Sequence, residues 1–263
     1  MRNKLQIFIK NFINILSQVL KVFLDQKENS KALLVGINYL NTKSELKGCV
    51  NDVQNVANYL QEQKLYESIE IMTDFTKDNL PTKENILKAL RNLCTDAKEG
   101  DRIFFHFSGH GTFQQDDNKD EKDGKDECLV TKDMKIITDD ELFGIFKILP
   151  KNVIVHAVID CCHSGTMLDL QYTFQNNTWT MQNRNTLQAQ VSVISGCMDH
   201  QYSLEKYIEG QFQGALTQAF LEEIKLKPKT IELVKNIQDR LDKQYPTLSL
   251  SDKILQDKIF FRN

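Results

Sequence analysis

The sequence predicts an α/β fold with a mostly parallel central sheet of about six or more strands and helices on both faces. Short, almost continuously apolar runs alternate along the chain with segments whose apolar residues recur at helical spacing, the pattern of a buried sheet covered by helices. The chain has 263 residues, 41% of them hydrophobic. That is enough for a buried core, and the composition argues against a disordered chain.

The expected strands lie at residues 32–37, 69–72, 103–107, 153–159 and 191–195. The expected helices lie at residues 50–63, 82–93, 139–147, 214–224 and 231–243. Two helix starts carry capping signals, because Thr138 opens a T-x-x-E box and Thr82 follows a proline.

The most polar internal segment is 171–188, which is rich in Asn, Gln and Thr and has no clear period. We predict that it links a large catalytic part at 31–170 to a smaller part at 189–263 of the same domain.

Residues 1–30 form a separate extension. Five Lys or Arg residues against two acids give this segment a charge of +3, and its apolar residues fall on one helical face. Its longest uninterrupted apolar runs are three residues, too short for a secretory signal. We expect an amphipathic basic helix. Docking on the protein or a partner, membrane-surface contact and organelle targeting remain alternative roles.

The net charge and the number of cysteines exclude some classes of protein. A net charge of −3 gives no basic field for nucleic acid. Six cysteines without a C-x-x-C pair are not a disulfide framework in a chain of this length. We therefore expect a reduced, cytoplasmic protein that does not bind nucleic acid.

Reactive side chains follow two of the expected strands. The strand at 103–107 runs into S-G-H-G with His110, and the strand at 153–159 runs into D-C-C-H-S-G with Cys162. The carboxyl ends of strands in open α/β sheets form the ligand crevice, so these side chains can meet. An imidazole beside a thiol supplies the base that a cysteine nucleophile needs. Their separation of 52 residues is near the value of about 50 typical of caspases.

Together with further short motifs in the chain, these two motifs resemble the metacaspases, within the caspase-like cysteine peptidases, over about residues 31–263. The further motifs are K-G-C-V-N-D at 47–52, D-G-K-D-E at 123–127, I-T-D-D-E-L at 137–142, S-G-C-M-D-H-Q-Y-S at 195–203 and G-A-L-T-Q-A-F at 214–220. The resemblance implies a caspase–hemoglobinase fold in a compact, type I-like arrangement.

The resemblance also implies catalytic roles. Cys162 falls at the nucleophile position and His110 at the position of the general base and acid, while the backbone N–H groups of Gly111 and Cys162 are the implied oxyanion donors. Cys161 stands where the family more often has Ser, which leaves a small ambiguity. Strand alternation points Asp160 and Cys162 to the same side and favours Cys162.

Four residues match the positions that line the specificity pocket of metacaspases: Cys49, Asp52, Ser108 and Asp160. Two carboxylates and a hydroxyl can bind a guanidinium or an ammonium group, so cleavage after Arg or Lys is expected. A pocket that binds an Asp side chain of the substrate would need basic residues, and the motifs that contain these four residues have none at the matching positions. The alternative for Asp52 is a carboxylate that only stabilises the first turn of a helix.

The resemblance implies an activating calcium ion bound by Asp126, Asp139, Asp140 and Asp169. Gathered carboxylates repel one another, and a hard divalent cation relieves that repulsion. An EF-hand loop does not fit, since Gly124 at loop position 6 puts Lys119 at position 1. Locally, Asp139 and Asp140 are also explained as first-turn acids of a helix, and the stretch between Asp126 and Asp139 is a few residues shorter than is usual in the family.

We therefore expect a calcium-activated cysteine endopeptidase that acts on proteins or peptides after Arg or Lys, and a monomer as is general in the family. Arg184 is the only Lys or Arg between Lys151 and Lys206 and is a candidate autocleavage point. The alternative is a catalytically silent caspase-like module used for regulation or assembly. A metal site of Cys161, Cys162 and His163 is disfavoured, because three adjacent side chains cannot converge on one tetrahedral ion.

Overall fold

The computed structural model describes residues 29–115, 125–162, 167–181, 186–196, 205–208, 210–241 and 244–261. The predicted amino-terminal helix and the candidate autocleavage residue Arg184 lie outside these ranges. Within them, no helix is both long enough and apolar enough to cross a membrane.

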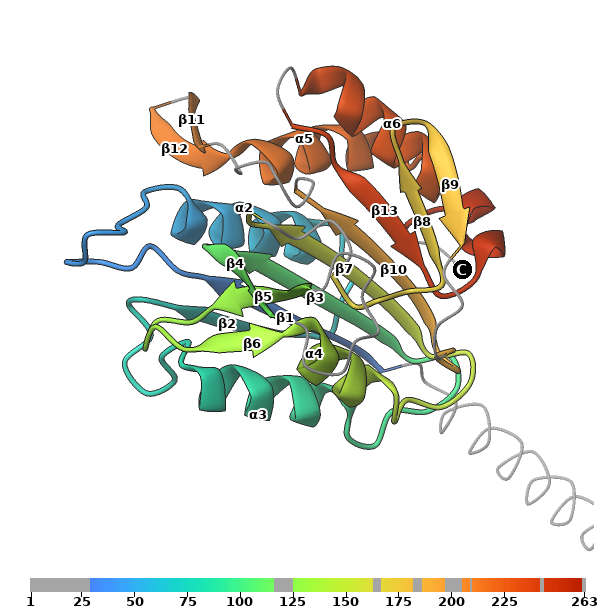
Figure 1. Ribbon diagram of the computed structural model, residues 1–263, viewed down its shortest axis with the longest axis horizontal. Helices are drawn as coiled ribbons and strands as arrows, with labels where there is room; N and C mark the ends of the chain where they lie inside the picture. Colours follow the sequence, from blue (N-terminus) through green and yellow to red (C-terminus); the bar gives the residue numbers. More distant parts are fainter. Residues whose placement is uncertain are drawn as a thin grey trace, which may run out of the picture.

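The centre of the molecule is an eight-stranded sheet (Figure 1). Its strands are, in spatial order, β2 (Ser68–Thr73), β1 (Ser30–Gly36), β3 (Arg102–Ser108), β7 (Ile154–Asp160), β10 (Gln190–Ser195), β13 (Thr247–Leu250), β8 (Tyr172–Gln175) and β9 (Thr178–Met181). The first five are parallel to one another, and the last three add antiparallel pairs. The five predicted strands are confirmed and form the parallel part.

Helices cover both faces of this sheet (Figure 1). On one face lie α3 (Lys83–Cys94) and α4 (Asp139–Phe146); on the other lie α2 (Cys49–Glu62), α5 (Ala215–Glu223) and α6 (Thr230–Arg240). Two short 3₁₀ helices, η1 (Ile224–Leu226) and η2 (Lys253–Asp257), follow α5 and β13. The predicted caps are present, since the Thr138 side chain completes a capping box with Glu141 and Thr82 accepts from the Asn85 amide.

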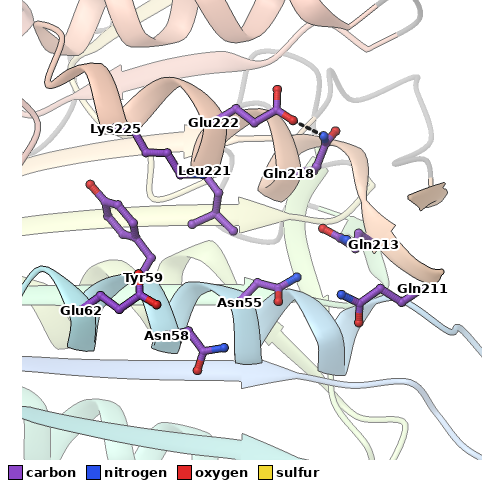
Figure 2. A pocket seen from close by; sticks show the side chains of 10 residues that line it. All are labelled: Asn55, Asn58, Tyr59, Glu62, Gln211, Gln213, Gln218, Leu221, Glu222 and Lys225. Carbon is purple, nitrogen blue, oxygen red and sulfur yellow. Dashed lines mark hydrogen bonds between the residues drawn. The ribbon is translucent and has the colours of Figure 1, made fainter. Parts of the chain in front are cut away.

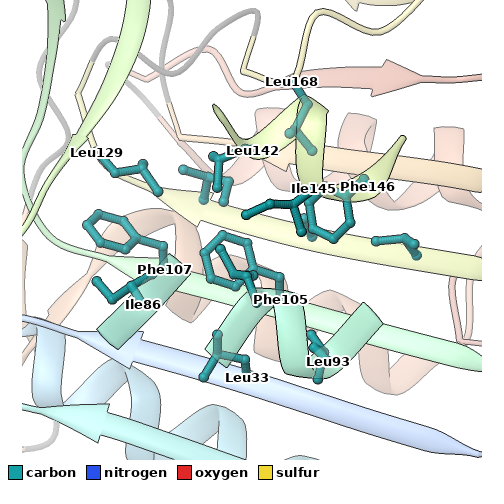
Figure 3. Packing of buried hydrophobic residues seen from close by; sticks show 14 of the residues in the cluster. Leu33, Ile86, Leu93, Phe105, Phe107, Leu129, Leu142, Ile145, Phe146 and Leu168 are labelled. Atoms are coloured by element: carbon teal, nitrogen blue, oxygen red, sulfur yellow. The ribbon is translucent and has the colours of Figure 1, made fainter. Parts of the chain in front are cut away.

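Strand alternation divides the buried residues into two cores. Leu33 and Phe105 belong to the core under α3 and α4 (Figure 3), whereas Leu34 and Phe104 belong to the core under α2, α5 and α6. Each buried large apolar side chain contributes about 1.5–3 kcal/mol to folding. Apolar side chains therefore stabilise the packing of helices on both faces of the sheet.

The segment 171–188, predicted as a linker, contains the hairpin β8–β9 over its described residues. Asn176 and Asn177 both have positive φ, at 49° and 57°, as in the tight turns that suit the twist of a hairpin. The buried Phe174 packs on Trp179 and anchors the hairpin beside β13. Many of the polar residues of this segment therefore lie in a pair of strands at the edge of the sheet, where we expected an irregular linker.

Two small accessory sheets stand at the carboxyl ends of the parallel strands. One contains β4 (Gly111–Gln115), β5 (Lys125–Val130) and β6 (Ile136–Thr138); the other is the hairpin of β11 (Glu205–Ile208) and β12 (Gln211–Gly214). β4 begins directly after His110, and β12 runs directly into α5. These small sheets therefore flank the strand ends that carry His110 and Cys162.

Candidate active site

The segments that carry His110 and Cys162 are in contact. Ser108 and Asp160 are register partners at the ends of β3 and β7, and the Gly109 amide donates to the Asp160 carbonyl oxygen at 3.3 Å. A Cβ atom placed on Gly111 would lie 1.8 Å from the Cys162 carbonyl oxygen. A side chain at residue 111 is therefore excluded, and glycine permits this close approach.

The two adjacent cysteines differ in accessibility. Cys161 is fully buried and belongs to the core under α3 and α4, whereas Cys162 is only partly buried. A thiol packed in an apolar core is inert, while a reactive thiol needs access to its substrate. The geometry thus favours Cys162 as the reactive residue of the pair.

The His110 imidazole has a fixed partner. Its Nε2 atom lies 2.7 Å from the carbonyl oxygen of Ser44, in the loop between β1 and α2. A carbonyl oxygen can only accept, so we assign the ring hydrogen to Nε2 and the lone pair to Nδ1. Ser44 contributes only its backbone, which explains why no motif revealed it.

The four predicted pocket residues, Cys49, Asp52, Ser108 and Asp160, are all buried. Ser108 Oγ donates to Asp52 Oδ2 at 2.6 Å, and the Gly214 amide donates to Asp52 Oδ1 at 2.8 Å. Such hydrogen bonds stabilise a buried carboxylate in its charged form.

Asp160 is held from the start of α5. The amide and the hydroxyl of Thr217 both donate to Asp160 Oδ2, each at 2.9 Å. The sequence did not reveal the role of Thr217. This residue lies within the G-A-L-T-Q-A-F motif, but the motif does not indicate which carboxylate the Thr217 side chain contacts.

Gly214 brings the two carboxylates together. A Cβ atom placed on it would lie 2.2 Å from Asp160 Oδ2 and 2.8 Å from Asp52 Oδ2. Both acids therefore face the same backbone position at the end of β12, and any side chain there would collide with them.

A second group of acids lies beside the β4–β6 sheet. Oxygen atoms of Glu127, Asp139 and Asp169 all lie within 4.8 Å of one another, and all three residues are buried. Leu168 and Asp169 both have positive φ, at 76° and 47°, a conformation uncommon outside glycine. The backbone is thus strained where Asp169 joins the other two acids.

Of the four predicted calcium ligands, the structure places Asp139 and Asp169 in this cluster. Asp126 instead accepts from Gln114 Nε2 at 3.0 Å, and Asp140 is exposed. Glu127 takes part although it was not predicted, because neighbouring residues of β5 point to opposite sides of the strand.

A separate polar cleft of about 320 Å³ lies between α2 and α5 (Figure 2). Its lining residues are Asn55, Asn58, Tyr59, Glu62, Gln211, Gln213, Gln218, Leu221, Glu222 and Lys225. None of them is a predicted site residue, so this cleft is distinct from the Cys–His centre.

Comparison with known proteins agrees with this geometry. Residues 30–171 match the family model described as the metacaspase, peptidase C14 domain. The chain is 33% identical to metacaspase-1B of Neurospora crassa, in a match that spans 88% of this chain and 68% of that protein. It is 34% identical to metacaspase-1 of Schizosaccharomyces pombe, over 84% of this chain and 67% of the relative.

A solved structure extends the agreement to the fold. The crystal structure of a Geobacter sulfurreducens protein superposes with a TM-score of 0.67 at 22% identity, covering 89% of this chain and 98% of the other. With the family match and the mostly parallel sheet, this is the caspase–hemoglobinase arrangement. The chain therefore belongs to the metacaspases, a family of cysteine peptidases with a caspase-like fold.

Proposed function

We propose that this protein is a calcium-activated cysteine endopeptidase that cleaves peptide bonds after Arg or Lys. The observation that carries the proposal is the meeting of two buried carboxylates, Asp52 and Asp160, at Gly214. Asp160 also ends the strand that leads into Cys162. A cationic side chain bound between the acids would therefore bring the following peptide bond to the Cys–His centre.

In the proposed reaction, the Cys162 thiol gives its proton to Nδ1 of His110, and the thiolate attacks the scissile carbonyl carbon. The Ser44 carbonyl holds the ring in the tautomer that leaves Nδ1 able to accept. The backbone N–H groups of Gly111 and Cys162 are proposed to stabilise the oxyanion. His110 then protonates the leaving amine. Water next attacks the acyl-enzyme while giving a proton to His110, and His110 passes this proton to the Cys162 sulfur as the acid product leaves.

Specificity for Arg or Lys follows from charge. Transfer of a cationic side chain into a buried pocket is costly unless it finds an opposite charge. Two carboxylates, held by Ser108, Gly214 and Thr217, would supply that charge. An acidic side chain would meet repulsion there.

Calcium fits the acidic cluster. Calcium binds carboxylate oxygens at about 2.3–2.6 Å, so two ligand oxygens on opposite sides of one ion lie at most roughly 5 Å apart. The oxygens of Glu127, Asp139 and Asp169 satisfy this limit. When bound, the ion would supply positive charge that offsets the repulsion between these acids and orders the β4–β6 sheet; Asp126 and Asp140 would need to move to join it.

The test uses fluorogenic peptides that end in Arg, Lys or Asp, with calcium or with a chelator. Cys162→Ala should abolish hydrolysis, whereas the matched Cys161→Ala should retain it. Activity that survives in Cys162→Ala would refute the nucleophile, and preference for Asp peptides would refute the pocket. No hydrolysis of any peptide by folded, calcium-treated wild type would favour the silent regulatory module instead.

Autocleavage at Arg184 remains a prediction. Mass spectrometry of calcium-treated wild type should detect a new carboxyl end at Arg184 that Arg184→Gln and Cys162→Ala both lack. An intact chain in calcium, under conditions where peptides are cleaved, would remove this part of the proposal.

A further inference from the structure

A tyrosine outside the predicted site lies directly against His110. The Tyr39 hydroxyl accepts from the His110 backbone amide at 2.8 Å and donates to the Val130 carbonyl oxygen at 2.7 Å. The two rings are also in contact, with centroids 4.6 Å apart. Tyr39 therefore touches both the backbone and the imidazole of the proposed base.

The same hydroxyl connects His110 to β5. Val130 ends β5, and its amide donates in turn to the His110 carbonyl oxygen at 2.9 Å. Glu127 of the acidic cluster lies three residues earlier on this strand. The backbone of His110 is thus linked to the end of β5 twice, directly through its carbonyl oxygen and through the Tyr39 hydroxyl from its amide.

The backbone around Tyr39 is adapted to this contact. Tyr39 has a φ of 52°, which is uncommon for a bulky residue, and the Thr42 hydroxyl donates to its carbonyl oxygen at 2.7 Å. A Cβ atom on Gly109 would lie 2.8 Å from the Tyr39 hydroxyl. Glycine in the S-G-H-G motif therefore leaves the space that the hydroxyl occupies.

The hydroxyl keeps its proton. Burial raises the pKa of Tyr39 well above its usual value; the hydrogen bond from the His110 amide opposes this rise, and the neighbouring Cys49, Cys161 and Asp74 add to it. A protonated hydroxyl can donate to Val130 and accept from His110 at the same time.

We propose that Tyr39 is a positioning residue that fixes His110 to β5, so that ordering of the acidic cluster sets the placement of the base. This inference rests on the proposed cysteine peptidase activity and its calcium dependence. In this role Tyr39 takes no part in proton transfer or bond formation; it acts only through its contacts with His110.

The first test compares Tyr39→Phe with Tyr66→Phe, which removes a hydroxyl from another buried tyrosine in the opposite core. Tyr39→Phe should lower kcat about tenfold to a hundredfold, since small misplacement of a catalytic group has effects of this size. KM should stay within about twofold, because the pocket acids are unchanged. Tyr66→Phe should leave both values unchanged. An unchanged kcat in folded Tyr39→Phe, or an equal loss in Tyr66→Phe, would overturn the proposal.

The second test does not need peptidase activity. Iodoacetamide alkylation of Cys162, followed by mass spectrometry, reports how well His110 supports the thiolate. Calcium should speed alkylation in wild type and in Tyr66→Phe, and this increase should be lost in Tyr39→Phe. If wild type hydrolyses no peptide, the proposed function fails, but the alkylation rates still decide the role of Tyr39. An equal calcium effect in both variants would refute it.

A measurement on wild type covers the case in which Tyr39→Phe does not fold. The His110 amide should exchange slowly with deuterium because it donates to the Tyr39 hydroxyl, and calcium should slow it further. Exchange at the rate of an unprotected amide would show that the bond is absent and overturn the inference.

Discussion

The protein contains two groups of buried acids that differ in the number of carboxylates and in the residues around them. The pocket acids, Asp52 and Asp160, receive hydrogen bonds from Ser108, Gly214 and Thr217. The cluster acids, Glu127, Asp139 and Asp169, bring their oxygens within 4.8 Å of one another. In the cluster, Asp139 accepts from the backbone amides of Asp140 and Glu127.

From this difference we expect a different ligand at each group. At the proposed pocket, protein donors fix the positions of the two carboxylates. The cluster places three like charges together, and like charges at this distance disfavour the ionised forms. We therefore expect substrate charge to govern binding at the pocket and a cation to govern order at the cluster.

The largest effect is expected at the pocket. Asp160→Asn should lower kcat/KM for Arg peptides by roughly a hundredfold or more, because loss of a buried charged partner typically costs about 2–5 kcal/mol. Asp101→Asn is the matched control: it is a buried acid that accepts from the Asn29 and Lys98 amides, just before the start of β3. Steady-state kinetics on Arg peptides measures both. Similar losses in the two variants would show that the pocket acid acts through stability alone.

The next effect concerns the cluster. Calcium at a hundred times its Kd should stabilise wild type by about 2.7 kcal/mol, which would raise Tm by a few degrees in thermal unfolding. Asp169→Asn should lose this shift, whereas Asp140→Asn should keep it because Asp140 is exposed. The pair Glu127→Gln and Asp126→Asn then separates the observed cluster from the ligand set that the sequence predicted. A shift that survives in Glu127→Gln but disappears in Asp126→Asn would favour the predicted set.

Acid pH tests a third set of buried ionisable groups, the histidines His106 and His156. Burial lowers the pKa of His106 to about 4, and burial with the nearby charge of Arg102 lowers the pKa of His156 to about 3. The unfolded chain, with a histidine pKa near 6.5, binds more protons below that pH, so stability falls as the pH falls. Each histidine should cost about 2 kcal/mol at pH 5 relative to neutral pH.

Denaturant unfolding of His156→Phe at pH 7 and pH 5 checks this assignment. The variant should lose about half of the acid-induced destabilisation that the two histidines produce. An unchanged pH dependence would assign the loss to the buried acids instead.

The smallest effect is expected for Thr217→Val, which removes one of the hydrogen bonds to Asp160 and keeps the side-chain volume. Hydrogen bonds to charged groups contribute about 1.5–3 kcal/mol, but the Thr217 amide still donates to Asp160. We expect KM for Arg peptides to rise roughly tenfold with kcat little changed. Ser108→Ala gives the corresponding measurement for Asp52. A fall in kcat at constant KM would show that Thr217 acts on the Cys–His centre and not on substrate binding.

The sequence was sufficient to predict the parallel part of the sheet because its strands are apolar on both faces and its helices have clear periods. The position of His110 and Cys162 at neighbouring strand ends follows from the same pattern. Backbone and long-range partners could not be predicted in this way. Ser44 and Tyr39 contact His110 from a loop about seventy residues earlier, and nothing in their local sequence indicates it.

The metal cluster shows a different limit of prediction. Asp126 and Glu127 are adjacent acids, so composition does not distinguish them, and only the pairing of β5 with β4 and β6 decides which one faces Asp139. For the β8–β9 hairpin, the Asn-Asn pair at its turn was a sequence feature that indicates a hairpin. The polar composition of the segment around it predicted a linker instead.

That hairpin has a consequence for self-association. β13 is paired on both sides, with β10 and with β8, so its backbone groups are occupied within one chain. The outermost strand of the sheet on this side is β9, which has four residues. Natural proteins use short outer strands to limit strand-to-strand association. Over its described residues, this edge offers a second copy little backbone to pair with. The monomer stays a prediction, which size-exclusion chromatography with light scattering can test.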